Sequence, residues 1–385
     1  MTARAGGVDC FRNSLDLFRR NALKLSNGGK ITVNVDERES SFQAMGYVFP
    51  EADKIPNPVA YFSTPNKNGR FQCRTESIQA IDPASANVLP WDKVKVRYDE
   101  HVIFPQYGDI TGSWDEDSLS LSWVTDVGSS SNCVLPRSKA AEPSELVAVE
   151  KDWGAYKEYV GSLPYRGYLF RGQNNQKRLR TKFHRTGRAN LSRFLKEDVP
   201  ALHQHLSART RHLFNLQNPD ENGAFWNLAQ HHGYPTPLLD WTYSPYVAAF
   251  FAYRGISNER AAAASLDAKV RISIFDQQQW KGDWLTSQML LVPAHHLSVL
   301  VFTAIENERV IPQQAVSTVT NVDDIESYIK SKESGTKKYL LAIDLPVRER
   351  RSVVRELSSM GITAGLLFPG LDGACEELTE RNFEV

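Results

Sequence analysis

The chain has 385 residues, with 45 basic and 45 acidic side chains and 41% hydrophobic residues. Its balanced charge excludes a protein that attracts nucleic acid or membranes through net charge alone, and no apolar run reaches the roughly 18 residues that a membrane-spanning helix needs. The N-terminus lacks the apolar core and cleavage site of a secretory signal, and the four cysteines lie far apart with no CxxC pair, so we expect a cytoplasmic protein with reduced thiols.

The first 140 residues predict a helix followed by a β-rich domain. Apolar side chains recur at helical spacing over residues 8–25. Over residues 30–134, short β-rich runs alternate with Gly, Pro, Asn and Asp. We predict a mostly β barrel or sandwich over residues 1–140, in which GSWDEDSLSLSW forms a hairpin. The β-rich runs are ITVNV, PVAYFST, VKVRY, HVIF and SLSLSWVT.

A linker and a second, α+β domain follow. The stretch 128–145 is polar and rich in Ser and Pro, which is typical of a linker, and we place the linker itself at 141–152. Residues 153–385 mix helical and strand patterns. Strands are predicted at YRGYLF, PLLDW, KVRISIFD, LSVLVFTA, RVIPQQAVSTV, KYLLAIDL and ITAGLLF, and helices at GAFWNLAQHHG, SPYVAAFFAYR and PVRERRSVVRELSSMG.

Several common catalytic and cofactor motifs are absent from the sequence. It contains no GxGxxG after a strand, no P-loop and no GxSxG elbow. The pair His231-His232 is not HExxH, and adjacent side chains on a helix point in different directions. We therefore expect neither a Rossmann-type dinucleotide site nor a metal centre.

Four segments of the second domain carry a family resemblance: YLFRGQ (168–173), FWNLAQHHGYPTPLLDWTYSPYVAAFFA (225–252), NERVIPQQAVST (307–318) and GITAGLLFPGLDG (361–373). Together they resemble the FRG domain, which is named for its Phe-Arg-Gly strand, here Phe170-Arg171-Gly172. The resemblance covers roughly residues 153–385. Where family members carry a glycine and an aromatic residue, this chain has Ala315 and Ser317.

The order of these segments is similar to that of the ADP-ribosyltransferase fold, a split sheet with helices. The arginine-type class of that fold has an Arg on its first strand, a Ser/Thr strand that leads into a helix, and an ExE pair before a late strand. Arg171, the Thr242-Tyr243-Ser244 segment and the Glu306-Asn307-Glu308 segment fill these places. The resemblance thus implies NAD as co-substrate.

The resemblance assigns the catalytic roles to the two glutamates. Glu308 would hydrogen-bond the ribose 2′-hydroxyl and stabilise the positive charge that develops when the nicotinamide–ribose bond breaks. Glu306 would face the acceptor and orient or deprotonate the attacking group. If the segment is extended, residues two apart share one face, which Asn307 does not. Two carboxylates so close would also raise each other's pKa.

Other residues would hold the cofactor. Arg171 would bind the pyrophosphate through its planar fork, and Gly172 would let the backbone approach the nicotinamide amide. Thr242 and Ser244 would hold the Arg or Glu side chains in place. An aromatic ring would cover the nicotinamide, and further polar groups would complete the site. The ring is that of Tyr246 or Tyr243, and the polar candidates are Gln173, Gln313 and Gln314.

Alternatives stay open for this segment. An isolated ExE is most often a solvated turn, and Arg171 could be a structural ion-pair partner. Asp240 could cap a turn while Trp241 fills the core. The segment can also be aligned with a family pattern of Asn-x-Arg followed by Gln. In this second alignment, Arg309 and Gln313 take the role that the first alignment gives to Glu308.

A basic stretch follows the Phe-Arg-Gly strand. Over residues 171–212 the basic side chains face only Glu197 and Asp198. Such a cluster favours a polyanion surface that binds phosphate backbones, although a solvated helical face gives the same pattern. The candidate acceptor-binding residues are Arg178, Arg180, Lys182, Arg185 and Arg188.

The resemblance therefore implies a toxin-like mono-ADP-ribosyltransferase that modifies a macromolecule. The basic stretch places RNA or another single-stranded nucleic acid slightly ahead of a protein acceptor. FRG proteins resemble toxin and phage-defence modules, so an antitoxin or inhibitor protein is a possible partner. The alternatives are a non-catalytic module that binds a nucleotide or nucleic acid, and an NAD glycohydrolase.

Overall fold

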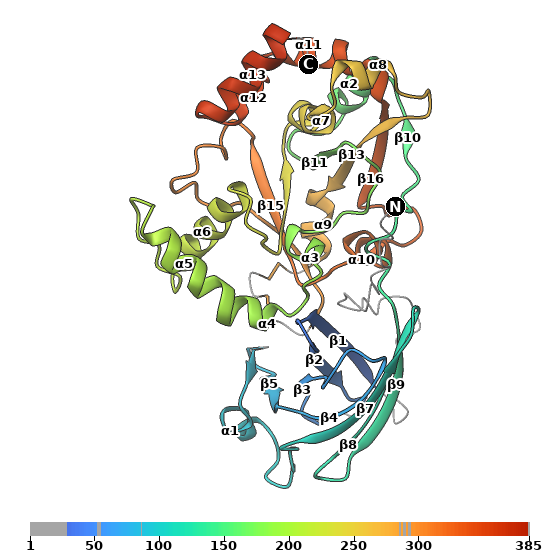
Figure 1. Cartoon of the computed structure of the whole chain (residues 1–385), viewed down its shortest axis with the longest axis vertical. Helices are drawn as coiled ribbons and strands as arrows, with labels where there is room; N and C mark the ends of the chain where they lie inside the picture. The colour runs from blue at the N-terminus through green and yellow to red at the C-terminus, as the bar shows by residue number, and fades with distance from the viewer. Residues whose placement is uncertain are drawn as a thin grey trace, which may run out of the picture.

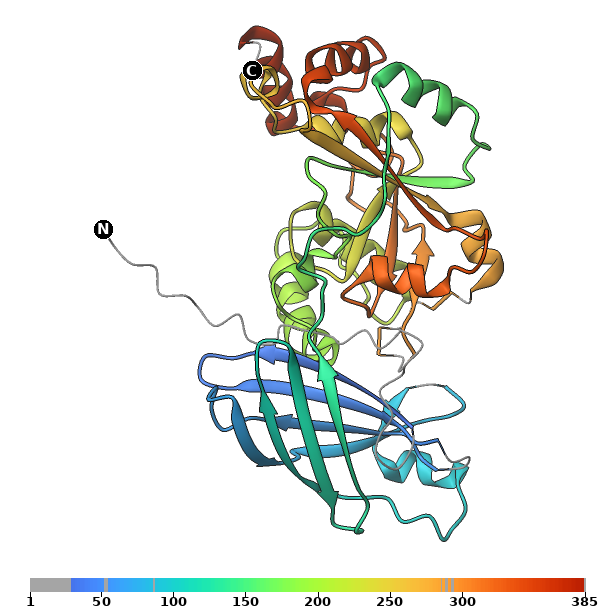
Figure 2. The ribbon, with the colours of Figure 1, turned by 90° about the vertical axis from the view of Figure 1, so that its right-hand side faces the viewer.

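The computed structural model describes residues 29–51, 55–85, 87–284, 286–287, 290–291 and 294–383. The helix expected over residues 8–25 lies outside these residues. Figures 1 and 2 show a β-rich N-terminal part below a mixed part of sheet and helices, which confirms the predicted α+β class. Among the described residues, no helix is long and apolar enough to cross a membrane.

The N-terminal part consists of two antiparallel sheets packed face to face. Neither sheet closes on itself within the described chain. Of the two predicted architectures, this part therefore has the β-sandwich and not the β-barrel. One sheet has the order β1(Lys30–Glu37), β2(Phe42–Phe49), β3(Pro58–Ser63), β5(Ser77–Ile81) and β6(Val88–Leu89). The other has the order β4(Arg70–Arg74), β7(Gly108–Trp114), β8(Ser118–Thr125) and β9(Ser130–Pro136).

Alternating side chains of the two sheets form the sandwich core. Val33 on β1 is fully buried against the other sheet, where Leu119 and Leu121 alternate with outward serines. The predicted hairpin is present, because β7 and β8 pair in antiparallel register from Gly108↔Thr125 to Trp114↔Leu119. Period-2 burial thus decides which face of each strand meets the core.

Two predictions in this part are wrong. The run VKVRY is helical, in α1(Trp91–Val94) and the 3₁₀ turn η1(Lys95–Arg97), and HVIF forms no strand. Each run buries a single apolar side chain, Val94 or Phe104, against Ala80, so neither has a strand face to pair. The start of the stretch expected to be linker-like is also a strand, β9, because Ser131, Cys133 and Leu135 alternate inward.

The second part is built on one seven-stranded sheet. Its order is β10(Val149–Glu150), β16(Leu340–Pro346), β13(Lys269–Asp276), β11(Tyr168–Gln173), β12(Leu238–Thr242), β15(Ala315–Thr320) and β14(Leu297–Leu300). Of these described strands, β10 and β16 run parallel, and the other neighbouring pairs are antiparallel. β11 pairs with β13 along its whole length but with β12 only at Phe170↔Thr242. The sheet therefore splits between β11 and β12.

Helices cover both faces of this sheet. Local signals set their ends: the Ser244 side chain accepts from Val247 N at 3.2 Å with Pro245 in the first turn, and Gly233 takes a φ of +90° after α6. The larger helices are α2(Trp153–Gly161), α5(Val199–Ser207), α6(Pro219–His231), α7(Pro245–Tyr253), α9(Gln277–Asp283), α10(Ile325–Lys332), α11(Arg350–Ser359) and α13(Leu371–Phe383). Shorter ones are α3(Lys182–Arg185), α4(Leu191–Arg193), the π-helical η2(Phe194–Asp198), α8(Asn258–Ala262), η3(Val347–Glu349) and α12(Ala364–Leu367).

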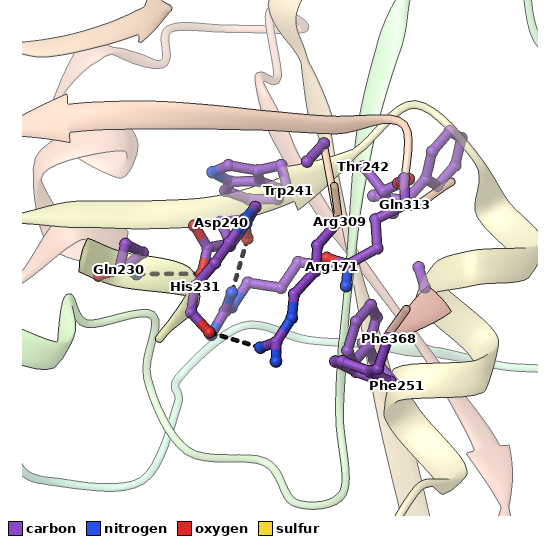
Figure 3. Close-up of a pocket in the computed structure, with 14 residues that line it drawn as sticks. Arg171, Gln230, His231, Asp240, Trp241, Thr242, Phe251, Arg309, Gln313 and Phe368 are labelled. Atoms are coloured by element: carbon purple, nitrogen blue, oxygen red, sulfur yellow. Dashed lines mark hydrogen bonds between the residues drawn. The ribbon is translucent and has the colours of Figure 1, made fainter. Parts of the chain in front are cut away.

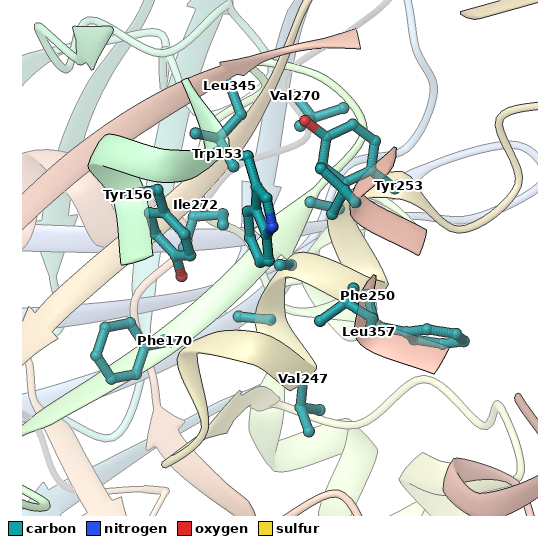
Figure 4. Close-up of a cluster of buried hydrophobic side chains, with 14 of the residues drawn as sticks. Trp153, Tyr156, Phe170, Val247, Phe250, Tyr253, Val270, Ile272, Leu345 and Leu357 are labelled. Atoms are coloured by element: carbon teal, nitrogen blue, oxygen red, sulfur yellow. The ribbon is translucent and has the colours of Figure 1, made fainter. Parts of the chain in front are cut away.

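The main core of the second part lies between the sheet and helices α2, α7 and α11. Figure 4 shows this cluster, to which Trp153 and Tyr156 of α2, Val247 and Tyr253 of α7 and Ile272 of β13 belong, all of them buried. Three alanines of α7 are also buried there, which lets this helix lie close to the sheet. This close packing fixes one wall of the pocket described below.

Three strand predictions near the C-terminal half fail in part. ITAGLLF contains the short helix α12, whose first turn is capped by the Thr363 side chain accepting from Leu366 N at 3.4 Å. LSVLVFTA is a strand only to Leu300, and RVIPQQAVSTV only from Ala315. Residues 308–314 form turns instead, so the segment with the two glutamates is not extended.

A buried carboxylate joins the two parts. Asp36 on β1 is fully buried and accepts from Ala189 N at 2.7 Å and from Asn190 N at 2.8 Å. Its Oδ2 also accepts from Arg188 Nε at 3.0 Å and from Arg193 Nη1 at 3.3 Å. One side chain of the sandwich therefore satisfies four donors at the start of α4.

Buried His184 makes the stability of the fold sensitive to acid. Burial, assisted by the charge of Arg180, lowers the pKa of His184 from 6.5 to about 3. Between these values the unfolded chain binds a proton that the folded chain does not. The free energy of unfolding is therefore fully retained at pH 7 and falls on acidification from about pH 6.5, by about 1.4 kcal/mol per pH unit from this residue.

We expect His184→Gln to flatten this dependence. Urea unfolding between pH 7 and pH 4.5 should give a smaller loss of unfolding free energy for the variant than for the wild type. His101→Gln, at an exposed position, is the control and should follow the wild type. Equal slopes for all three proteins would contradict the assignment.

Candidate functional site

A pocket of about 270 Å³ opens where the sheet splits between β11 and β12. Its walls come from both strands, from α6 and α7, and from the turns before β15 and after α12 (Figure 3). It is lined by Phe170, Arg171, Gly172, Gln230, His231, Asp240, Trp241, Thr242, Ala248, Phe251, Arg309, Gln313, Ala315 and Phe368.

Arg171 provides the main positive charge of the pocket. Its Nη1 donates to the carbonyl of Asp240 at 2.6 Å, while its Nε is buried and has no partner among the described residues. Burial lowers the pKa of Arg171 to about 10, and the nearby Asp240 carboxylate opposes this shift. The group remains charged at neutral pH, so it presents an unsatisfied donor to an anionic ligand.

A second guanidinium, that of Arg309, also lines the pocket and is drawn next to that of Arg171 in Figure 3. Its Nη1 donates to the carbonyl of His231 at 2.6 Å, and its Cζ lies 5.5 Å from the ring centre of Phe368. These contacts fix the side chain in the wall of the pocket. Two arginines held in this way suit a ligand with more than one phosphate oxygen.

Two phenylalanines form an apolar wall. Phe251 of α7 and Phe368 after α12 meet edge to face, with ring centres 5.8 Å apart. Tyr246, a predicted aromatic cover, instead packs against Trp153 with ring centres 6.2 Å apart and does not line the pocket. The runs AAFFAYR and GLLFPG carried these phenylalanines in the sequence, but nothing local showed that they face one pocket.

Thr242, Ser244 and Gln313 hold the walls together. Thr242 Oγ1 donates to the Gln313 carbonyl at 2.7 Å and accepts from Ser244 N at 3.0 Å. Gln313 Nε2 donates to the Leu367 carbonyl at 2.7 Å, which ties the turn before β15 to α12. Thr242 and Gln313 line the pocket, whereas Ser244 lies outside it as the cap of α7.

Gly172 lies where α7 crosses β11. A Cβ at this position would fall 1.8 Å from the Ala248 carbonyl oxygen and 2.6 Å from Ala252 N. Close packing of helix on strand therefore requires glycine here, whatever the ligand. Gln173, the next residue, lies outside the pocket and donates through Nε2 to the Lys177 carbonyl at 3.3 Å.

The two glutamates lie outside the pocket. Glu306 adopts a φ of +52° and accepts from His212 N, and both Glu306 and Glu308 are exposed. The residue between them points inward: Asn307 is buried and donates to Asn227 Oδ1 at 2.7 Å. The expectation of an extended segment with both carboxylates on a site face is thus wrong, although their catalytic roles stay predictions.

Arg309 and Gln313, from the second alignment of this segment, do line the pocket. So does Asp240, whose Oδ2 accepts from Gln230 Nε2 at 3.0 Å. Asp240 lies within strand β12, so the interpretation as a turn cap is wrong, whereas Trp241 is buried in the core as expected. Asp240 provides the carboxylate of the pocket. One feature of the sequence indicates this role: Asp240 lies within a segment that resembles the family, between Arg171 and Thr242.

Internal ion pairs engage most of the predicted basic surface. Arg178 is buried and pairs with Asp324 at 2.9 Å, and Arg180 pairs with Asp323. Arg188 pairs with Asp36, and Lys182 donates to the Gly233 carbonyl. Counterion release needs charges that are free to meet a phosphate backbone, so these four residues do not support the nucleic-acid prediction. That prediction stays untested.

Arg185 differs from its neighbours. It is exposed, makes no side-chain hydrogen bond or ion pair with any residue the structure describes, and interacts electrostatically with Asp240. Arg185 does not line the pocket, but its charge interacts with those of Arg171 and Asp240, which do. As for metals, no group of three or more His, Cys, Asp or Glu side chains suited to an ion occurs in the described part of the chain.

Comparison of the chain with known proteins identifies the family of one of its segments. No curated protein and no solved structure matches the chain. The model of the FRG domain matches residues 166–261, which include β11, α6, β12 and α7. Arg171, Asp240 and Phe251 fall within this match, while Arg309, Gln313 and Phe368 follow it. The chain therefore contains an FRG domain, at residues 166–261.

Proposed function

We propose that the pocket at the sheet split binds NAD and that the protein is an ADP-ribosyltransferase. The buried Arg171 guanidinium, whose Nε has no partner in the described part of the chain, is the observation that supports this most directly. A buried donor without a partner is costly unless a ligand satisfies it. The FRG domain and its similarity to the ADP-ribosyltransferase segment order supply the choice of NAD over other anions.

The residues of the pocket fit one end of a dinucleotide. The cavity of about 270 Å³ is near the lower limit of ligand pockets, which span roughly 300–1,000 Å³. It therefore suits a nicotinamide ribose and its phosphate, with the rest of the molecule outside. Arg171 and Arg309 would bind the phosphates, and Phe251 and Phe368 would flank the nicotinamide ring.

The carboxylate that best fits the reaction is that of Asp240. Bound NAD supplies a nicotinamide–ribose bond whose cleavage leaves positive charge on the ribose. Asp240 lines the pocket beside Arg171, and its hydrogen bond with Gln230 holds the side chain in place. A fixed carboxylate there would stabilise that charge. Glu306, which accepts from His212 N, and Glu308 are both exposed, and we propose that they meet a macromolecular acceptor instead.

Arg171→Lys should weaken NAD binding by about 10- to 100-fold, because lysine keeps the charge but loses the planar fork. Isothermal titration calorimetry of the full chain with NAD would measure this. Arg260→Lys makes the same exchange at an exposed position outside the pocket and should bind as the wild type does. Equal affinities for the two variants would contradict the role of Arg171.

The reaction itself is tested by nicotinamide release and by label transfer from NAD to RNA, DNA or protein. Asp240→Asn should abolish release while NAD binding persists, and Glu308→Gln should lower transfer more than release. Release without transfer would identify an NAD glycohydrolase. A wild-type protein that binds NAD but releases no nicotinamide would exclude the transferase.

That last outcome would favour a second candidate, a non-catalytic nucleotide-binding module. The observation in its favour is the exposure of Glu306 and Glu308 outside the pocket. Under this alternative, Glu308→Gln and Asp240→Asn leave nucleotide binding unchanged, while Arg171→Lys still weakens it.

A further inference from the structure

A second cavity of about 310 Å³ lies among α7, α8, α11, α12 and α13. The two cavities share no lining residue. Ala364 at the start of α12 lines the second cavity, whereas Phe368 just after the helix lines the first. Its charged lining residues are Arg350, Arg351, Arg355, Arg381, Glu377 and Glu380.

The charges of this cavity do not cancel. Arg350 is buried and donates through Nη2 to Glu380 at 2.8 Å, so this pair is neutral. The Glu377 carboxylate accepts from Gly365 N at 3.0 Å. Arg351 apart, two guanidiniums, those of Arg355 and Arg381, then remain against the one carboxylate of Glu377.

The side chains of Arg355 and Arg381 are available to a ligand. Arg355 on α11 and Arg381 on α13 are exposed, and neither side chain makes a hydrogen bond or ion pair with another described residue. The hydroxyl of Ser358 lines the same cavity. Planar guanidinium forks from two helices, with a hydroxyl in the same cavity, match the oxygens of a phosphate group.

The rest of the cavity is apolar. Phe250, Val354 and Ile362 line it, and all three pack against the main core. A flat ring can lie on such a surface while a charged group meets the arginines. At about 310 Å³, the cavity is at the lower end of the roughly 300–1,000 Å³ found for ligand pockets, so it suits a small molecule and not a folded partner.

We propose that this cavity binds a nucleoside phosphate, with the phosphates on Arg355 and Arg381 and the base or sugar against Phe250 and Ile362. The site is independent of the proposed transferase activity, because none of its residues belongs to the first pocket. It is nevertheless close to that pocket: the Leu367 carbonyl of α12 accepts from Gln313, which lines the first pocket.

The test is calorimetric titration of the full chain with ADP and with inorganic pyrophosphate. The double variant Arg355→Ala/Arg381→Ala should lose at least tenfold in ADP affinity. The double variant Arg209→Ala/Arg211→Ala removes the same charge from exposed positions outside both cavities and should bind as the wild type does. All changed side chains are exposed, so the variants should fold, as equal melting temperatures would show.

The two probes separate the parts of the proposal. Tighter binding of ADP than of pyrophosphate supports a nucleoside phosphate held partly by the apolar floor. Equal binding of the two probes, equal affinity of both double variants, or no binding of ADP by the wild type would each overturn it. Because Arg171→Lys changes only the first pocket, ADP binding at the second site should persist in that variant even if the transferase proposal fails.

Discussion

Alanine at position 172 should lower the free energy of unfolding by on the order of 3 kcal/mol. The added Cβ would lie 1.8 Å from the Ala248 carbonyl oxygen and 2.6 Å from Ala252 N. Both are backbone atoms of α7, which cannot move aside as a flexible side chain can. Relief of the clash requires α7 to shift from the sheet and open the core around Tyr156 and Tyr253.

Thermal or urea unfolding of Gly172→Ala measures this effect. Gly161→Ala is the matched control, because a Cβ at Gly161, the last residue of α2, meets no atom within 4 Å. Alanine there should leave stability unchanged or raise it by up to about 1 kcal/mol. If both variants unfold at the same urea concentration as the wild type, the close packing of α7 on β11 is not what requires glycine.

Asp36→Ala should destabilise the chain by about 3–5 kcal/mol, the usual cost of removing one partner of a buried charged pair. The carboxylate is fully buried and accepts from Ala189 N, Asn190 N, Arg188 and Arg193. Without it, two guanidinium groups and two backbone amides lose an acceptor at a site with little water. The contact between the sandwich and α4 should weaken first, so proteolysis near residues 182–199 should accelerate.

Asp109→Ala provides the comparison, since Asp109, like Asp36, is an aspartate that accepts from an arginine. That pair, with Arg74, lies on the surface of the sandwich, at 2.8 Å and 2.9 Å. Exposed pairs contribute little because solvent screens them, so we expect almost no change in urea unfolding. Equal effects of the two substitutions would mean that Asp36 is not the main link between the two parts.

The sequence predicted part of the candidate site. Arg171, Gly172, Thr242 and Gln313 all line the pocket, because they lie in or beside strands that meet at the sheet split. The exposure of Glu306 could not be predicted. It depends on the turn in which Asn307 bonds to Asn227 and His231, 80 and 76 residues away.

The contacts of the phenylalanine wall and of the basic stretch could not be predicted from the sequence either. Phe251 and Phe368 lie on separate elements, and only the packing of α12 beside α7 makes them neighbours. Arg178 and Arg180 follow the Phe-Arg-Gly strand closely, but their partners, Asp324 and Asp323, are more than 140 residues away. A count of charges within one stretch cannot include such partners.

The sequence by itself determined features that depend on a few neighbouring residues. Alternation set the hairpin of β7 and β8, and Ser244 with Pro245 set the start of α7. The FRG match likewise rests on contiguous segments. These signals act through backbone preferences and hydrogen bonds of short range.

The tertiary structure alone decided the helical form of VKVRY, the strand β9, the split between β11 and β12 and the burial of Asp36. Each depends on contacts between residues far apart in the chain. The free energy of burying a side chain or pairing a charge is set by those distant neighbours and not by the local pattern.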